Sequence, residues 1–361
     1  MENNCQNIAI VFTSLNIGGI ERKIVDLSIH YSTQKNIRLH LFLKINQGTF
    51  LNKIPPNVKI HFLSASKNQF INLVYPVWLW RQLLILKPNL VLSFGNFSSI
   101  CAIIANFFSI QTKLVISEDS SIDVQISNDS FSLIRQVLVR LTYPLASGAI
   151  VLTPTARQKI GKYLPLSKVT FLPNWLPINI PLSNLPPSLK PIDILFVGRL
   201  VAQKDPLKFL DFCRQIQKNL PTIKISMIGD GELKPKIINY ITRHHLSVEL
   251  LPSSSPVDQY YQQSKVLVLT SVHEGFPLTI LESFYYSCPV ICPSLNEVKP
   301  FYIFEPEKFI YSQPKVAIKL ITAAILYPDT LKKSVQKYRD YVVTTRDQNF
   351  HATLDYLQQF L

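Results

Sequence analysis

The chain has 361 residues, more than a usual single domain, so its length predicts two domains. Its five cysteines are scattered without the spacing of a metal finger, which argues against a disulfide framework and indicates a reducing compartment such as the cytoplasm. The formal net charge of +14 is concentrated in residues 1–172, which hold 17 Lys+Arg against 7 Asp+Glu. A basic half indicates an anionic partner. Because no nucleic-acid-binding module accompanies the charge, we expect an anionic membrane surface and no nucleic acid.

The first half of the chain alternates apolar strand patterns with helical ones. This alternation predicts a parallel sheet covered by helices on both faces. The expected strands are residues 8–12, 38–43, 58–62, 90–93, 114–117 and 149–152, and the expected helices are residues 20–34, 70–86, 98–108, 131–145 and 155–162.

Two segments of this half resemble membrane elements in composition. Trp78 and Trp80 lie beside Arg81, which is typical of an interfacial segment, and a helix of the domain core is the alternative. Residues 88–112 contain no charged residue, but polar residues and Gly95 interrupt the apolar run. We therefore expect a strand, a turn and a helix there, not a membrane span.

A proline-rich stretch separates the two halves. Six prolines fall within the 19 residues 173–191. Proline-dense sequence resists helix formation and makes a stiff, extended connector. We therefore place a linker at residues 173–191, between an N-terminal domain of residues 1–172 and a C-terminal domain of residues 192–345.

The first turn of the second half is suited to binding phosphate. A predicted strand over residues 193–197 ends at Gly198, which permits a tight turn or a close backbone approach. Arg199 offers a planar fork of donors and Lys204 a mobile point charge, a pairing suited to two linked phosphates. Both residues could equally be solvated surface charges.

The second half repeats the alternation of strands and helices. After the next strand, Gly229 and Gly231 form another turn, which lacks the third glycine of the dinucleotide-binding fingerprint. Helical sequence runs from residue 315 to the end of the chain. The strands are expected near residues 193–197, 223–228, 248–251, 266–270 and 289–292.

The most informative stretch runs from Glu274 to Glu282, behind a predicted buried strand. Pro277 lies at an expected helix start, where free N–H groups and a partial positive charge make an anion site. Glu274 lies at the edge of that site, and Glu282 is expected about two turns into the helix. The two carboxylates can accept from hydroxyl groups on either side of the anion, which is the layout of a nucleotide diphospho-sugar. Many ordinary βα units also carry two glutamates, so the spacing leaves both interpretations open.

Together these elements resemble the C-terminal half of the retaining glycosyltransferases of family four, the "group 1" family with the GT-B fold. Residues 197–200 with Lys204, residues 228–233, and the pair of glutamates eight residues apart carry the resemblance. Residues 15–22 are similar to the family's glycine loop, and residues 172–174 to its Pro-Asn before the linker.

Two positions depart from the family pattern. Glu118 follows Ser117 where the family often has His, and this variation is similar to a subgroup that builds bacterial surface glycans. After Ile291 the usual Gly-Gly turn is missing. No donor contact is therefore assigned to that turn.

The resemblance implies an α/β architecture of two Rossmann-like, doubly wound parallel-sheet domains that face a central cleft, with residues 346–361 crossing back to the N-terminal domain. It implies a retaining, metal-independent hexosyl transfer from a UDP- or GDP-linked sugar to a glycan or lipid-linked acceptor, without a further cofactor. The protein would then serve polysaccharide biosynthesis in the cytoplasm, peripherally on the cytoplasmic face of the membrane.

The resemblance also implies roles for individual residues. Glu274 and Glu118 are the expected catalytic residues, with Glu118 on the acceptor side. No metal ligand is expected, because the chain has no Asp-x-Asp motif. The donor diphosphate is expected to contact Arg199, Lys204, Gly18 and Gly19. The donor sugar and nucleotide are expected to contact Gly198, Gly229, Glu274, Gly275, Phe276, Pro277, Leu278, Thr279 and Glu282.

Two alternatives keep the same fold. One is a catalytically inactive protein that binds a sugar nucleotide, for which Glu118 and the missing Gly-Gly turn argue. The other is a sugar-nucleotide epimerase, which converts its donor without any acceptor. A nicotinamide-dependent oxidoreductase is disfavoured, because no Gly-x-Gly-x-x-Gly follows the first strand. The base, the sugar, the linkage and the acceptor are left open by the sequence.

Overall fold

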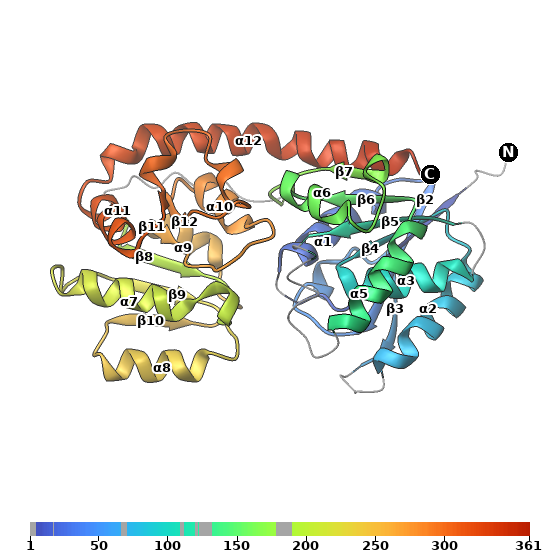
Figure 1. The fold of residues 1–361 in the computed structure, drawn as a ribbon, viewed down its shortest axis with the longest axis horizontal. Coiled ribbons are helices and arrows are strands. Elements are labelled where there is room, and N and C mark those ends of the chain that lie inside the picture. Colours follow the sequence, from blue (N-terminus) through green and yellow to red (C-terminus); the bar gives the residue numbers. More distant parts are fainter. Residues whose placement is uncertain are drawn as a thin grey trace. The chain divides into compact units, whose positions relative to one another are not determined.

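The computed structural model describes residues 5–16, 18–65, 71–108, 112–119, 122, 132–177 and 190–361. The chain divides into two compact units. Unit 1 comprises Met1–Ile178 and Gln348–Leu361, and unit 2 comprises Asn179–Asp347. Each unit is built on one parallel sheet flanked by helices, which confirms the predicted α/β class (Figure 1).

The sheet of unit 1 has the strand order β3-β2-β1-β4-β5-β6-β7. Its central strands are runs of Val, Ile and Leu buried on both faces, as expected of strands inside a parallel sheet. The strand order reverses between β1 and β4, which pair directly. The strands are β1 (Gln6–Phe12), β2 (Ile37–Ile45), β3 (Lys59–Ser64), β4 (Leu90–Phe94), β5 (Lys113–Glu118), β6 (Gly148–Val151) and β7 (Val169–Phe171).

Helices cover both faces of this sheet. One face forms a core with α2 (Ile71–Leu86), α3 (Asn96–Phe107), α5 (Ser132–Thr142) and α6 (Pro154–Ile160). The other face packs against α1 (Gly19–Ser32) and the end of the last helix. Trp78 and Trp80 of α2 pack against the first of these cores. The side of α2 that carries them therefore faces the domain core, as the alternative interpretation of this segment expected.

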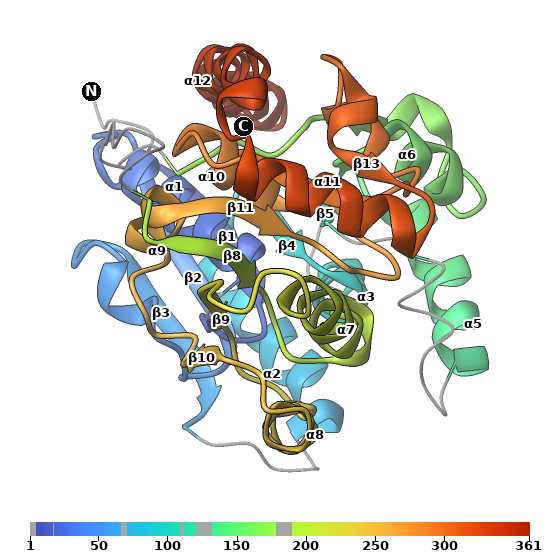
Figure 2. The ribbon, with the colours of Figure 1, turned by 90° about the vertical axis from the view of Figure 1, so that its left-hand side faces the viewer.

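The sheet of unit 2 has the strand order β10-β9-β8-β11-β12-β13. Helices α7 and α11 lie on one side of it and α9 and α10 on the other (Figure 2). The strands are β8 (Ile192–Val197), β9 (Ile225–Ile228), β10 (Val248–Leu251), β11 (Ser264–Val268), β12 (Val290–Pro293) and β13 (Ile310–Tyr311). The helices are α7 (Pro206–Gln217), α8 (Lys234–Arg243), α9 (Val257–Gln263), α10 (Leu278–Tyr285) and α11 (Pro314–Leu326).

The predicted helical sequence from residue 315 forms two helices. The first is α11, and α12 (Asp329–Gln358) follows after Tyr327 and Pro328. Proline lacks the N–H that would continue a helix, which explains the break. Phe350 and Leu357 at the end of α12 are buried in the core of unit 1. The side chain of Gln6 in β1 donates to the carbonyl of Leu361 at 2.9 Å.

The linker expected at residues 173–191 falls largely on residues 178–189, which lie outside the described residues. Trp175 is buried in unit 1, where its indole N–H donates to Asp26 at 2.8 Å. Unit 1 therefore continues past residue 172. In the part of the chain that the structure describes, no helix is both long enough and apolar enough to cross a bilayer.

Candidate functional site

Three turns of unit 2 follow strands that lie side by side. β8 pairs with β9 on one side and with β11 on the other, and the strand order reverses between β8 and β11. In open parallel sheets, ligands bind beyond the carboxyl ends of the strands at such a reversal. Neighbouring parallel strands end at the same edge of the sheet, so the turns after β8, β9 and β11 share that edge.

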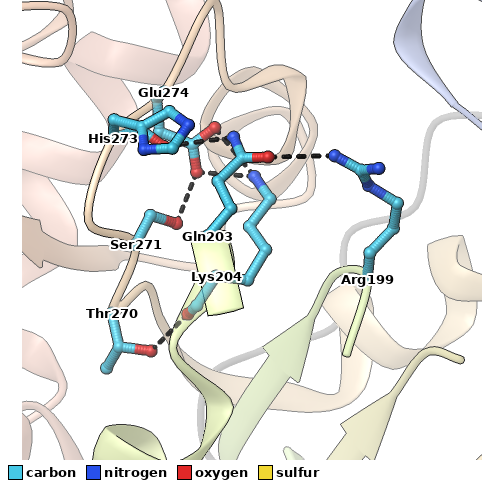
Figure 3. A network of polar contacts seen from close by, with 7 residues as sticks. All are labelled: Arg199, Gln203, Lys204, Thr270, Ser271, His273 and Glu274. Carbon is cyan, nitrogen blue, oxygen red and sulfur yellow. Dashed lines mark hydrogen bonds and ion pairs between the residues drawn. The ribbon is translucent and has the colours of Figure 1, made fainter. Parts of the chain in front are cut away.

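Lys204 and Glu274 form an ion pair at this edge. The Nζ atom of Lys204 lies 2.6 Å from Oε1 and 2.7 Å from Oε2 of Glu274. The Glu274 carboxylate is only 4% exposed and also accepts from the hydroxyl of Ser271 (Figure 3). A buried carboxylate needs such partners, because an unpaired charge in the interior is costly. Glu274 is therefore held in one orientation, with its charge paired.

Arg199 joins the same network through Gln203. Its Nη2 donates to Oε1 of Gln203 at 2.9 Å, and Nε2 of Gln203 donates to the carbonyl of His273 at 3.2 Å (Figure 3). The structure thus brings Arg199, Lys204 and Glu274 into one connected set. Gln203 and Ser271 were missed by the sequence analysis, although Gln203 directly precedes Lys204.

The backbone at Lys204 is fixed by its neighbours. Asp205 has a positive φ of 45° and caps α7, accepting from the N–H of Lys208 at 3.3 Å. The hydroxyl of Thr270 donates to the carbonyl of Lys204 at 2.9 Å and to that of Asp205 at 2.8 Å. A left-handed conformation is unfavourable for a non-glycine residue and persists only where its surroundings enforce it. These bonds connect the start of α7 to the segment that follows β11.

The turns after β8 and β9 are packed backbone to backbone. Gly229 has a φ of 158°, and a Cβ there would lie 1.9 Å from the carbonyl oxygen of Gly198. The N–H of Leu200 donates to the carbonyl of Asp230 at 2.9 Å. Gly229 is therefore required by the close approach of the two turns. A Cβ at Gly198 would find its nearest neighbours at 3.7 Å, which is ordinary contact.

Helix α10 begins at Leu278, with Pro277 as its N-cap and no side chain capping it. The N–H group of Ile280 donates to the carbonyl of Pro277 at 3.0 Å, and those of Leu278 and Thr279 precede the first bonds of the helix. The hydroxyl of Thr279 is buried and has no hydrogen-bond partner among the described residues. The ring of Phe276 packs edge-on against Phe301 at 4.5 Å, and Gly275 is half-buried.

Glu282 lies nearer to the helix start than the sequence analysis placed it. It is the fifth residue of an eight-residue helix, little more than one turn from its start. Its carboxylate is buried and accepts from the hydroxyl of Tyr261 on α9 at 2.9 Å. Tyr261 was not anticipated, because nothing in the local pattern of α9 distinguishes it from a core residue.

The remaining predicted residues belong to unit 1. Gly18 is the N-cap of α1 and Gly19 its first residue. A Cβ on Gly18 would lie 2.3 Å from the carboxylate of Glu21, so the absence of a side chain makes room for that group. Glu118 is the last residue of β5 and is buried.

Glu118 is part of a buried polar chain. Its Oε1 accepts from the hydroxyl of Tyr143, which in turn accepts from Nδ2 of Asn96 at 2.8 Å. Its Oε2 is buried without a hydrogen-bond partner among the described residues. Burial raises the pKa of Glu118 to about 8, and the charge of Asp119 adds to the increase while the bond from Tyr143 opposes it. The carboxyl group is therefore mainly protonated at neutral pH.

A buried lysine that the sequence did not reveal contacts Ser117 and Asp119, the two residues next to Glu118 in the chain. Nζ of Lys23 is 3.3 Å from Oγ of Ser117 and 3.4 Å from Oδ1 of Asp119. It also lies over the rings of Phe94 and Trp175, at 5.6 and 5.4 Å from their centroids. Burial lowers the pKa of Lys23, and the attraction of Asp119 opposes that shift. No group of three His, Cys, Asp or Glu side chains in the described ranges is arranged to hold a metal ion.

Comparison with known proteins places these features in a family. Residues 183–325 match the family model "Glycosyl transferases group 1". An alpha-1,4-N-acetyl-D-galactosaminyltransferase of Campylobacter jejuni, named for an acceptor linked to PP-undecaprenol, is 26% identical over 304 residues, covering 81% of this chain and 80% of that protein. The amylovoran biosynthesis glycosyltransferase AmsD of Erwinia amylovora is 28% identical over 213 residues, covering 56% of this chain and 57% of that protein.

The fold has a close counterpart among solved structures. The crystal structure of Anabaena HepE in complex with UDP and glucose superimposes with a TM-score of 0.80 at 16% identity, covering 97% of this chain and 100% of that chain. Likeness at this level of identity concerns the fold alone. The part of the second unit that spans residues 183–325 therefore matches the group 1 glycosyltransferases, and the chain has the GT-B fold.

Proposed function

We propose that this glycosyltransferase retains the anomeric configuration and works without a metal ion, moving a sugar from a UDP- or GDP-linked donor to a glycan or lipid-linked acceptor. The observation that carries the proposal is the network of Arg199, Lys204 and Glu274 at the strand reversal of unit 2. Two cations that flank a buried carboxylate, beside an uncapped helix start, match the charges of a diphospho-sugar.

The diphosphate is assigned to Lys204, Arg199 and the start of α10. An ammonium group has three donors, and Glu274 occupies two of those of Lys204. The third is left for a phosphate oxygen. One N–H donor of Arg199 binds Gln203, and its other donors, which lie in the same plane, are left for a second phosphate oxygen. The N–H groups of Leu278 and Thr279 at the start of α10 supply further donors, together with the positive end of the helix dipole.

The sugar and the nucleoside are assigned to the two glutamates. Glu274 is fixed by Lys204 and Ser271, so its remaining lone pairs have a defined direction toward sugar hydroxyl groups. Glu282 is oriented by Tyr261 and would accept from the ribose hydroxyl groups. The hydroxyl of Thr279, which has no hydrogen-bond partner in the described part of the chain, is assigned to the same ligand.

The chemistry follows from where charge develops. As the glycosidic bond breaks, negative charge grows on the leaving diphosphate, and preorganised cations stabilise that charge most. Lys204, Arg199 and the start of α10 supply the positive charge that a metal ion supplies in other enzymes. The acceptor hydroxyl attacks from the face of the leaving group and its proton passes to the leaving phosphate, so no protein nucleophile is required. Glu118 is assigned to the acceptor, as a buried acid of unit 1 whose Oε2 has no hydrogen-bond partner among the described residues.

The acceptor class is inferred from the relatives. Two Campylobacter jejuni proteins and one Escherichia coli protein are named for acceptors linked to undecaprenol through a diphosphate. We therefore assign a lipid-linked oligosaccharide as acceptor, and the cytoplasmic face of the membrane as the place of action in polysaccharide biosynthesis.

The test is transfer from a panel of UDP- and GDP-sugars to an undecaprenyl-diphosphate-linked acceptor. Lys204→Ala and Arg199→Ala should each lower kcat by about 100-fold, the usual cost of one preorganised donor. Lys218→Ala, which removes an exposed lysine from the end of α7, is the matched control and should leave the rate unchanged. EDTA should have no effect, and NMR of the product should show the anomer of the donor. Activity of the two variants within threefold of the parent would refute the assignment, and donor conversion without acceptor would indicate an epimerase.

A further inference from the structure

Helix α5 presents an apolar stripe to solvent. Leu133, Val137 and Leu141 recur every four residues and are 74%, 57% and 67% exposed, and Ile134 beside them is also exposed. Residues at this spacing share one face of a helix. The opposite face carries Val139, which is fully buried in the core of unit 1. The described residues of the chain thus leave one full side of α5 uncovered.

Helix α2 has the same arrangement. Tyr75, Leu79 and Leu83 are buried in the same core as Val139. On its other side, Leu73 and Ile85 are 76% and 79% exposed, and further exposed apolar residues lie between them. Aliphatic side chains as exposed as these bury little apolar area and therefore contribute little to the stability of the fold.

The two stripes belong to one helical layer. Helix α3 packs against both α2 and α5, and the three helices lie on the same face of the sheet (Figure 1). Helix α3 is almost entirely buried, but Phe107 and Phe108 at its end are exposed, with their rings packed edge to face. The outer surface of this layer therefore gathers aliphatic and aromatic groups, which marks an interaction surface.

The charges of this layer all have one sign. Between Asp26 and Glu118, and again between Asp129 and Asp193, the sequence contains no Asp or Glu. Helices α2, α3, α5 and α6 therefore carry no carboxylate at all. Arg81 lies among the exposed residues of α2, and Arg140 lies at the edge of the stripe on α5. Such a surface is electrostatically complementary to a layer of phosphate groups, because it carries positive charges and no negative charge.

We propose that the outer face of α2, the end of α3 and α5 docks on an anionic phospholipid bilayer. Apolar side chains interleaved with arginine, without any acidic residue, are the composition of elements that lie in a membrane interface. The aliphatic groups enter the boundary between headgroups and acyl chains, and the arginines bind lipid phosphates. This proposal rests on the proposed function. A lipid-linked acceptor lies at a membrane surface, so an enzyme that docks on that surface can reach it.

The experiment is flotation of the full chain with vesicles. Vesicles of phosphatidylglycerol and phosphatidylcholine at low salt should retain the protein, and vesicles of phosphatidylcholine alone should retain much less. The variant Leu133→Ser with Val137→Ser and Leu141→Ser should lose at least tenfold in vesicle affinity. Arg140→Glu should lose about fivefold or more and should weaken the dependence on salt, since each basic residue near an anionic surface is worth about fivefold. Ile238→Ser and Lys236→Glu, exposed residues of α8 in unit 2, are the matched controls.

The outcomes separate this proposal from the proposed function. Melting shifts with UDP- or GDP-sugars should be the same in the α5 variants as in the parent, which shows that unit 2 is intact. Loss of vesicle binding with retained nucleotide binding supports the membrane surface. Equal vesicle binding by the parent and the α5 variants overturns it, whatever the result for transfer. A parent that ignores the vesicles but forms dimers that the α5 variant abolishes also overturns it, in favour of contact with a second copy.

Discussion

At the scale of the single residue, Glu118 is a buried acid whose pKa is raised to about 8. It is a carboxyl group buried at the end of a central strand, where burial disfavours its charge. One oxygen is bonded to Tyr143, and the other has no hydrogen-bond partner among the described residues. A protonated acid in this position can donate a hydrogen bond from its second oxygen, which an ionised one cannot.

The proton on Glu118 makes stability depend on pH. The folded pKa of about 8 lies above the ordinary value of 4.5, so the unfolded chain releases the proton first as pH rises. The contribution of Glu118 is therefore fully present below pH 4.5 and is lost as pH rises to about 8. Over this window the free energy of unfolding of the parent should fall by up to about 1.4 kcal/mol per pH unit relative to that of Glu118→Gln, as measured by urea denaturation. Glu232→Gln, an exposed residue, should keep the slope of the parent, whereas equal slopes in the parent and Glu118→Gln would show that Glu118 is ionised when folded.

At the scale of elements, the site depends on two turns that touch through their backbones. The turns after β8 and β9 are joined by hydrogen bonds, and Gly229 faces the carbonyl of Gly198. The position of Arg199, which directly follows Gly198, depends on this contact. The close approach is possible only because no side chain stands between the turns.

Substitution of the two glycines should therefore have unequal effects. Gly229→Ala places a Cβ 1.9 Å from the Gly198 carbonyl at a φ of 158°, so we expect a loss of about 3 kcal/mol or more. Gly198→Ala meets its neighbours at 3.7 Å and should stay within about 1 kcal/mol of the parent. Chemical denaturation followed by circular dichroism measures both. Similar losses in the two variants would contradict the packing of these turns.

At the scale of the whole molecule, the chain returns to unit 1 after unit 2 is complete. The last residues of α12 form part of the core of unit 1. There the ring centroids of Phe350 and Trp175 lie 5.1 Å apart. All three tryptophans of the chain, Trp78, Trp80 and Trp175, belong to unit 1. Tryptophan fluorescence therefore reports the unfolding of unit 1, and circular dichroism reports both units.

Removing a side chain at the end of α12 should destabilise one unit selectively. Leu357 is fully buried, and Leu357→Ala should cost unit 1 about 2–5 kcal/mol through lost burial and the cavity left behind. The fluorescence transition in urea should move to lower denaturant, while the melting shift caused by a bound nucleotide sugar should persist. Val343→Ala, a partly exposed residue of the same helix, should leave the fluorescence transition in place. An unchanged transition in Leu357→Ala would show that unit 1 does not need the end of α12.

Local sequence was sufficient to predict the alternation of strands and helices, the parallel sheets and the glycine turns, because buried strands, prolines and glycines each leave a pattern within a few residues. It did not predict the short edge strands β7 and β13, whose two or three residues are held by pairing with a neighbour. Only tertiary structure decided which side chains meet, since the order β8 next to β11 joins Lys204 to Glu274 across 70 residues. The partners Tyr261 and Tyr143 are likewise supplied by elements that pack against their glutamates, and no spacing along the chain encodes such packing.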